Sequence, residues 1–404
     1  MFRRWVLLIL FLFCLDASLC IAQSYDSLSS QQTDSLPTIS LLTCGAGNNY
    51  YQLEGHSALR LQYPDGRDIV VNWGVFDFRK PNFAYRFVKG ETDYSIGIEP
   101  MDLFMSGYVH SDRSVTQQIL NLTPSEKENL IKLIDKNLLP QNRIYRYNYV
   151  KDNCATRPLD ILENALTADS ASILINEPQQ NTTFREEMRK YHNQSPGYQF
   201  FIDYALGNGL DYTITPKEQA FAPIFLEKLA ASAQIINNKG QSRPLVSETK
   251  ILYQRTSSSY QEPFPNPLWF TIIIFVLAIY LNHRDQKRNK ISIWFDGIYY
   301  SIIGILGSLL TFLVFFSSHE ATSPNLNILW INPLCFIVPI LIGIKTFRKI
   351  LYIYQWINVI LMIAFILCLP IFGQSTNPSI IFLLLTDFVR SENYITYYRK
   401  NNAR

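Results

Sequence analysis

The stretch PLWFTIIIFVLAIYLN, residues 267–282, decides the fold because it is almost entirely apolar and contains no charged residue. A helix of about 20 apolar residues crosses the hydrocarbon core of a bilayer. Four further apolar stretches follow in the last third of the chain, at 293–316, 328–344, 351–371 and 377–390. The sequence therefore predicts an all-α transmembrane bundle of about five helices within residues 263–390.

Basic residues mark the expected cytoplasmic side of this bundle. They gather in the segments 284–290 and 345–349 and in the C-terminal tail, and such residues are enriched in cytoplasmic loops. We therefore expect a multi-pass protein of the bacterial inner membrane, with the tail 391–404 in the cytoplasm and the N-terminal domain in the periplasm. Asp387, near the inner end of the last stretch, is either a functional acid inside the membrane or snorkels to its surface.

The N-terminus has the pattern of a secretory signal peptide at residues 1–22. Arg3 and Arg4 precede an apolar run, and small residues lead to Ala22. Lipidation at Cys20 and an uncleaved anchor are the alternatives. Residues 23–262 have an ordinary charged composition, so we expect them to form the exported domain. With 36 basic and 33 acidic residues, the net charge of +3 is too balanced for a nucleic-acid binder, and no nucleic-acid partner is expected.

The exported domain reads as an α+β fold. Pro64-Asp65-Gly66 has strong turn chemistry, which predicts a hairpin between the strands on either side of it. Thr123-Pro124-Ser125-Glu126 has the pattern of a helix start and precedes an apolar stripe of helical spacing. The expected strands are 37–43, 57–63, 68–73 and 142–149, and the expected helices are 123–138, a segment after Cys154 to about 166, 182–192 and 216–233.

Two cysteines and three histidines of this domain are candidates for chemistry. Cys154 follows a strand and begins a helix, where free N–H groups lower a thiol pKa and favour the thiolate. His56, placed after a glycine at a strand start, is the preferred base over His110 and His192. A disulfide between Cys44 and Cys154 is the alternative in an oxidising compartment. The histidines lack paired ligand spacing and no phosphate-binding glycine loop is present, so neither a metal nor a cofactor is expected.

Three motifs in a fixed order carry a resemblance to a known family. They are Gly55-His56-Ser57-Ala58-Leu59-Arg60, Asn72-Trp73-Gly74-Val75-Phe76-Asp77-Phe78, and Tyr147-Asn148-Tyr149 with Asp152-Asn153-Cys154. With the appended membrane region, they resemble the Lnb-type bacterial lipoprotein N-acyltransferases. The order of histidine first and cysteine later is similar to circularly permuted papain/NlpC-like enzymes.

This resemblance implies roles for individual residues. Cys154 would be the nucleophile and His56 the general base and acid. A third polar group that orients the imidazole should lie on the strand after His56, which points to Asn72, with Asp77 and Glu54 as alternatives. Backbone N–H groups at the start of the Cys154 helix would stabilise the oxyanion.

Further residues are expected to bind substrate. Tyr147, Asn153 and Arg157 flank Cys154 and are candidates for binding the oxyanion or a phosphate, although a surface ion pair is as good a reading for Arg157. In the outer loop, His319, Asn325 and Asn327 are candidates for holding a lipid headgroup, with helix capping as the plainer interpretation.

The function implied is acyl transfer at the lipid bilayer. A phospholipid would donate a fatty acyl chain to the Cys154 thiol, and the N-terminal amine of a diacylglyceryl-lipoprotein would accept it. A thiol hydrolase acting on phospholipids or peptidoglycan peptides uses the same residues. A non-catalytic envelope scaffold, in which Cys154 is structural, is the third possibility.

Overall fold

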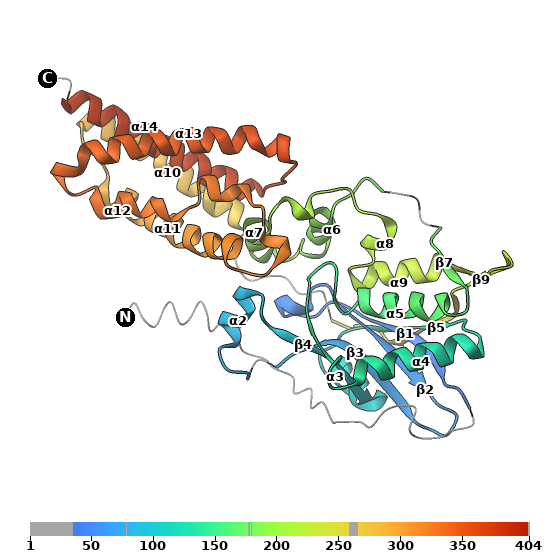
Figure 1. Ribbon diagram of the computed structural model, residues 1–404. Coiled ribbons are helices and arrows are strands. Elements are labelled where there is room, and N and C mark those ends of the chain that lie inside the picture. Colours follow the sequence, from blue (N-terminus) through green and yellow to red (C-terminus); the bar gives the residue numbers. More distant parts are fainter. Residues whose placement is uncertain (1–34, 78, 177, 179, 258–265, 403–404) are drawn as a thin grey trace. The chain divides into compact units, whose positions relative to one another are not determined.

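The computed structural model describes residues 35–77, 79–176, 178, 180–257 and 266–402 (Figure 1), so the predicted signal peptide lies outside the described residues. The chain divides into two units, each with its own core. The first consists of Met1–Asn181 and Ile214–Tyr260, and the second of Thr182–Thr213 and Gln261–Arg404. The chain therefore leaves the first unit and returns to it before the first membrane helix.

An antiparallel sheet forms the centre of the first unit. The predicted strands at 37–43, 57–63 and 68–73 are present as β1, β2 and β3, and β2 and β3 pair across the predicted turn. The strand order is β10-β5-β1-β2-β3-β4-β6. The strands are β1 (Thr38–Cys44), β2 (His56–Gln62), β3 (Asp68–Val75), β4 (Asp93–Pro100), β5 (Val115–Leu120), β6 (Ile144–Arg146) and β10 (Val246–Tyr253).

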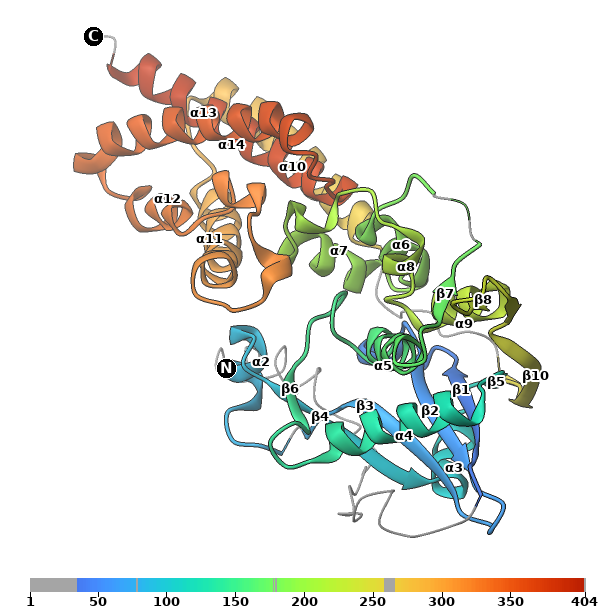
Figure 2. The same ribbon diagram turned by 45° about the vertical axis from the view of Figure 1, so that its right-hand side comes forward.

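Helices cover both faces of this sheet (Figures 1 and 2). Leu41 and Leu59 face a core shared with α4 (Pro124–Leu138), α5 (Thr156–Thr167) and α9 (Pro223–Ser232). Leu42 and Ala58, one position along each strand, face a second core with α3 (Met101–His110). Side chains alternate between the two faces along a strand. Since apolar residues stand at both sets of positions, both faces of the sheet are apolar and each is covered by helices.

Local capping explains where several helices begin. Thr123 and Glu126 form the capping box that the sequence predicts for α4. The helix expected at 216–233 is instead two helices, α8 (Pro216–Gln219) and α9, because Pro223 starts a new helix. The remaining elements of this unit are η1 (Tyr50–Gln52), α2 (Phe83–Lys89) and a small sheet of β7 (Ser172–Leu174), β8 (Gln234–Ile236) and β9 (Ser242–Pro244).

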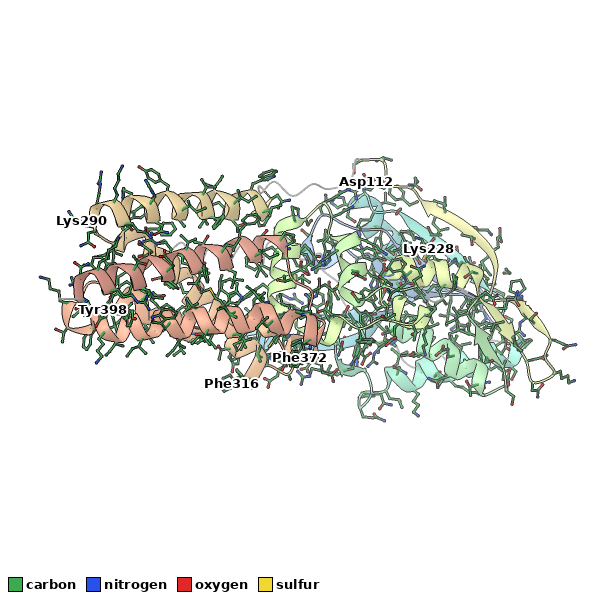
Figure 3. The ribbon with its side chains drawn as sticks, turned by 90° about the horizontal axis from the view of Figure 1, so that it is seen from above. Asp112, Lys228, Lys290, Phe316, Phe372 and Tyr398 are labelled. Atoms are coloured by element: carbon green, nitrogen blue, oxygen red, sulfur yellow. The ribbon has the colours of Figure 1, made fainter. Side chains whose placement is uncertain are left out.

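The second unit is a helical bundle. Among the described residues, three helical segments are long and apolar enough to cross a membrane, at Pro267–Arg288, Ile293–Phe315 and Lys345–Phe372. They correspond to α10 (Pro267–Arg288), α11 (Ile293–Phe315) and α13 (Arg348–Phe372, preceded by η6 at Lys345–Phe347). Figure 3 shows Lys290 and Tyr398 at one end of the bundle and Phe316 and Phe372 at the other, as expected when consecutive helices alternate in direction.

Two of the five expected spans differ from the prediction. The stretch expected at 328–344 is broken into η4 (Leu326–Leu329), η5 (Pro333–Phe336) and α12 (Ile337–Leu341), because Asn332 caps a new turn at Pro333. Its backbone packs so closely on α11 that a Cβ at Gly307 would lie 2.4 Å from the Asn332 carbonyl carbon. The stretch expected at 377–390 is part of a longer helix, α14 (Pro378–Asn402).

Two helices from the middle of the chain belong to the second unit. They are α6 (Phe184–Tyr191) and α7 (Pro196–Ala205), followed by η2 (Asn208–Leu210). Arg185 is fully buried and pairs with Asp203 and Asp211 at 3.4 and 2.7 Å. Asp203 also accepts a hydrogen bond from Asn377, which immediately precedes α14, at 2.9 Å. A buried ionic network therefore holds α6 and α7 on the helical unit.

Candidate active site

A glycine places His56 at the first position of β2. Gly55 has a φ of +84°, and a Cβ there would lie 2.3 Å from the Cys44 carbonyl oxygen. Only glycine accepts this conformation and this close approach without strain. His56 consequently enters the sheet directly opposite Cys44, the last residue of β1. The expected position of His56 after a glycine at a strand start is confirmed.

A chain of polar side chains runs from His56 across the sheet. The His56 Nε2 atom lies 3.0 Å from the Oδ1 atom of Asn72 on β3, and Asn72 is buried. The Nδ2 atom of Asn72 donates to Glu99 Oε1 on β4 at 2.8 Å. Of the three residues considered for orienting the imidazole, Asn72 is in contact with it. Asp77 pairs with Arg79, and Glu54 accepts a hydrogen bond from Tyr149.

Cys154 lies in the short connection between β6 and α5, and its side chain is half-buried. Gly74 lies against it, since a Cβ at that position would be in ordinary van der Waals contact, 3.6 Å from the Cys154 Cβ atom, and the φ of +87° is what favours glycine there. The backbone N–H of Ser57 and the hydroxyl of Tyr147 lie close enough to the thiol to favour its ionised form, since both lower the pKa of Cys154. Since Ser57 follows His56 on β2, these contacts bring the thiol to the same strand start as the imidazole.

The electrostatics of the resting pair differ from the sequence-based expectation. The protein atoms packed around Cys154 raise the pKa of its thiol to about 11, although the Ser57 N–H opposes the shift. Burial lowers the pKa of His56 to about 4. The expected lowering of the thiol pKa by the helix start is therefore wrong, because desolvation outweighs it. The resting site holds a neutral thiol and a neutral imidazole, and no hydrogen bond joins them among the described residues.

The side chain of Asn153 accepts hydrogen bonds from the backbone N–H groups at the start of α5. Its Oδ1 atom accepts from the backbone N–H groups of Ala155 and Thr156 at 2.8 and 3.0 Å. Its Nδ2 atom donates to the carbonyls of Tyr149 and Phe221 at 2.9 Å each. The Asn153 side chain is buried, and its amide N–H groups and oxygen all have protein partners. The structure therefore gives it a positioning role, not the expected contact with substrate. The first helical N–H groups are likewise not available to an oxyanion.

Tyr147 and Arg157, the other residues expected near the thiol, have different surroundings. The Tyr147 hydroxyl lies near the Cys154 thiol and lowers its pKa, and the Tyr147 ring stacks on Tyr94, with ring centroids 4.4 Å apart. The Arg157 Nη2 atom donates to Asp152 at 2.8 Å, and its guanidinium lies 3.4 Å from the Tyr145 ring centroid. Arg157 therefore forms an ion pair, which was the equal alternative to phosphate binding, while Tyr147 remains next to the reactive atom.

The candidate headgroup residues of the outer loop lie within the helical unit. Asn325 and Asn327 are buried, and both donate to the carbonyl of Tyr204 at the end of α7, at 3.0 and 3.2 Å. Their amides hold α7 in place, so the expectation that they bind a headgroup is not supported by their surroundings. His319 is half-buried at the start of η3 (Glu320–Thr322), where its carbonyl accepts from Thr322 Oγ1.

Cys44 and Cys154 are both free thiols in the described structure. Burial raises the pKa of Cys44 to about 12, as it raises that of Cys154 to about 11, so the two thiols differ in exposure: Cys44 is buried and Cys154 is half-buried. Arg113, also buried, donates from Nε to the carbonyl of Gly45 at 2.9 Å beside this thiol. The structure thus separates a buried Cys44 from the more accessible Cys154.

Fold and site together define a membrane protein whose α+β domain brings a cysteine, a histidine and an asparagine to one end of a sheet. Comparison with protein families agrees with this class. The chain matches the Lnb N-terminal periplasmic domain over residues 26–189 and the Lnb transmembrane domain over residues 259–401. No curated protein and no solved structure gives a significant match.

The chain is therefore an Lnb-type protein, a lipoprotein-processing membrane protein with a periplasmic N-terminal region. The expected family and the expected α+β domain followed by a helical membrane region are confirmed.

Proposed function

We propose that this protein is an N-acyltransferase that moves a fatty acyl chain from a phospholipid to the N-terminal amine of a diacylated lipoprotein through a thioester on Cys154. The observation that carries the proposal is that the thiol of the half-buried Cys154 lies near Ser57, the residue that follows His56 of the His56–Asn72 pair, in an Lnb-type chain. A neutral imidazole next to a neutral thiol suits general-base activation of the nucleophile.

In the first half-reaction, the Cys154 sulfur attacks the ester carbonyl of the phospholipid while His56 takes the thiol proton. The tetrahedral intermediate then collapses, the ester C–O bond breaks, and His56 returns that proton to the leaving lysophospholipid oxygen. The Ser57 N–H and the Tyr147 hydroxyl face the sulfur, so they are the groups placed to stabilise the oxyanion. The products are a thioester on Cys154 and a lysophospholipid.

In the second half-reaction, the lipoprotein amine attacks the thioester carbonyl and forms an amide. His56 removes the proton from the attacking amine, and the same proton returns to the departing sulfur. Because both substrates are lipids, the apolar helices of the second unit hold the site and its substrates at one bilayer. The clusters of basic residues at 284–290, 345–349 and 390–404 support a cytoplasmic C-terminus opposite the periplasmic N-terminal region.

A thiol hydrolase is the second candidate, because Cys154 is half-buried and not fully enclosed, and water could replace the amine as acceptor. The two functions differ in what accepts the acyl group. An amine acceptor gives an N-acylated lipopeptide, whereas water gives a free fatty acid.

The test offers both acceptors to the purified full-length protein in detergent. Phospholipid with labelled acyl chains is supplied with a diacylated lipopeptide whose N-terminus is either free or acetylated. We expect label on the free-amine lipopeptide, none on its acetylated copy, and none with Cys154→Ala. Labelled free fatty acid in equal amount with both lipopeptides would identify a hydrolase and contradict the proposal.

A further inference from the structure

The orientation of the Asn72 amide is fixed by its two partners. The oxygen and nitrogen of an asparagine are similar in shape, so their chemistry decides which faces which neighbour. One end of this amide lies 2.8 Å from Glu99 Oε1 and the other lies 3.0 Å from His56 Nε2. An ionised carboxylate only accepts hydrogen bonds. Glu99 therefore requires the NH2 group, and the carbonyl oxygen must face the histidine.

This orientation decides which imidazole nitrogen is basic. The Asn72 oxygen can only accept, so Nε2 of His56 must carry the hydrogen in the neutral ring. The lone pair is then on Nδ1, which becomes the nitrogen that takes a proton from a nucleophile. With the opposite amide orientation, Nδ1 would carry the hydrogen and lose this ability.

We propose that Glu99 is a positioning residue that fixes the Asn72 amide and, through it, selects the Nε2–H tautomer of His56, which makes Nδ1 the base. The residue does not touch the reacting atoms. The proposal rests on the proposed function for its catalytic meaning, but the tautomer it predicts is a property of the resting protein.

The surroundings of Glu99 are consistent with this role. It lies on β4 directly opposite Val70, next to the strand carrying Asn72, and it is half-buried. Burial raises the pKa of Glu99, while the hydrogen bond donated by Asn72 opposes the shift. An amide donor is thus what keeps the acceptor form of this carboxyl favourable.

Exchanging the two functional groups tests the proposal. In Glu99→Gln, the new amide offers both a donor and an acceptor, so Asn72 can turn over and present NH2 to His56. In Asn72→Asp, two carboxylates face each other and repel at pH 8. The double variant, Asn72→Asp with Glu99→Gln, places a carboxylate at position 72 that accepts from His56 Nε2–H and from the amide at position 99. The double variant therefore restores the order of donors and acceptors.

Two measurements on the full-length protein in detergent, made without any lipid, show how each variant changes His56. One is the rate of Cys154 alkylation by iodoacetamide, and the other is the tautomer of His56 from its ¹⁵N ring resonances. We expect each single variant to slow alkylation about tenfold to a hundredfold, as removal of a group that orients a functional histidine does. The Nε2–H tautomer should be lost in Glu99→Gln, and the double variant should recover rate and tautomer. Glu248→Gln, the same change on the exposed strand β10, should leave both unchanged.

An unaltered tautomer and rate in Glu99→Gln, or a double variant no better than the worse single one, would overturn the proposal. Equal melting temperatures across the series separate positioning from general loss of structure. If the predicted pattern appears but no acyl group is transferred, the proposed function is wrong and the role of Glu99 in selecting the tautomer still holds.

Discussion

Both units of this protein contain networks of hydrogen-bonded polar side chains, but only the network of the first unit leads to a cysteine thiol. In the first unit, the Glu99–Asn72–His56 chain leads from a half-buried carboxyl to an imidazole at the strand start beside the accessible Cys154. In the second unit, Arg390 is fully buried and donates to Asp285 and Asp296 at 3.0 and 2.8 Å. The network of the first unit ends at the proposed nucleophile, whereas the Arg390 network joins side chains of α10, α11 and α14.

Asp387 is a second buried polar residue of the bundle whose contacts join helices. Its Oδ1 atom accepts from Tyr300 and Asn358 at 2.6 and 2.8 Å, and the residue is completely buried. It therefore does not snorkel to the membrane surface, which was one of the two expectations for it. Buried polar groups in a membrane bundle are costly unless paired, so these contacts join α11, α13 and α14. Burial of a charge alone does not identify a site of chemistry, and the accessible thiol is the distinguishing feature.

The largest expected effect is a loss of activity without a loss of stability, on substitution of one residue in the first unit. Cys154→Ala should abolish acyl transfer, because no other described thiol lies at the imidazole in an accessible position. The melting temperature should stay close to wild type, since the change removes one sulfur atom from a half-buried side chain. Transfer assays and thermal unfolding check this, with Cys368→Ala in α13 as the matched control. Full activity of Cys154→Ala would rule out the nucleophile.

The next effect should appear in the second unit as a loss of stability. Arg390→Ala leaves Asp285 and Asp296 buried without their cation, which typically costs about 3–5 kcal/mol. The rate of Cys154 alkylation in the surviving folded protein should be unchanged. Denaturant unfolding in detergent measures the first quantity, and Lys287→Ala, at an exposed position of α10, is the control. Wild-type stability for Arg390→Ala would contradict the structural role given to this network.

The third prediction concerns pH. A lowered pKa of about 4 for His56 means that the imidazole remains a neutral base at every pH above that value. The rate of acyl-enzyme formation should therefore persist from pH 8 to about 5 and fall about tenfold per pH unit below 4. A pH–rate profile of the full-length protein checks the sign. An acid limb near pH 6.5 would indicate an unperturbed histidine and contradict the burial argument.

The smallest expected effect comes from the residue next to the nucleophile. Asn153→Ala removes the acceptor for two N–H groups at the start of α5, which typically costs about 1 kcal/mol. Asn153→Asp keeps this acceptor but turns a buried carboxylate oxygen toward the Tyr149 and Phe221 carbonyls, so it should not recover the lost stability. Thermal unfolding of the two variants measures the difference. If Asn153→Ala lost transfer activity at full stability, a substrate-binding role would replace the positioning role.

The sequence predicts the part of the site that depends on local patterns. His56, Asn72 and Cys154 lie on or beside elements that turn chemistry and alternation predict, namely β2, β3 and the start of α5. The sequence does not single out Glu99, because β4 lacks a clear pattern and its partner Asn72 is 27 residues away in sequence. Hydrogen bonds of this kind depend on strand pairing, which composition does not reveal.

Tertiary burial explains the remaining differences. The position of Cys154 before a helix is visible in the local sequence, whereas its pKa is raised by tertiary burial and by the charge of Glu54, which lies on a distant segment. The amides of Asn325 and Asn327 resemble ordinary loop polarity in the sequence, and their partner at Tyr204 lies about 120 positions earlier. The broken stretch at 328–344 has a visible signal in Asn332-Pro333, since proline interrupts a helix.

Cys154 should become acylated with the help of His56, and peptide mass spectrometry detects the acyl group on the peptide itself. Wild-type protein and His56→Ala are incubated with phospholipid in detergent and then digested. The account predicts a fatty-acyl mass on the wild-type Cys154 peptide that hydroxylamine removes, and its absence in His56→Ala. An unmodified, alkylatable Cys154 in the wild type, or a disulfide between Cys44 and Cys154, would contradict it.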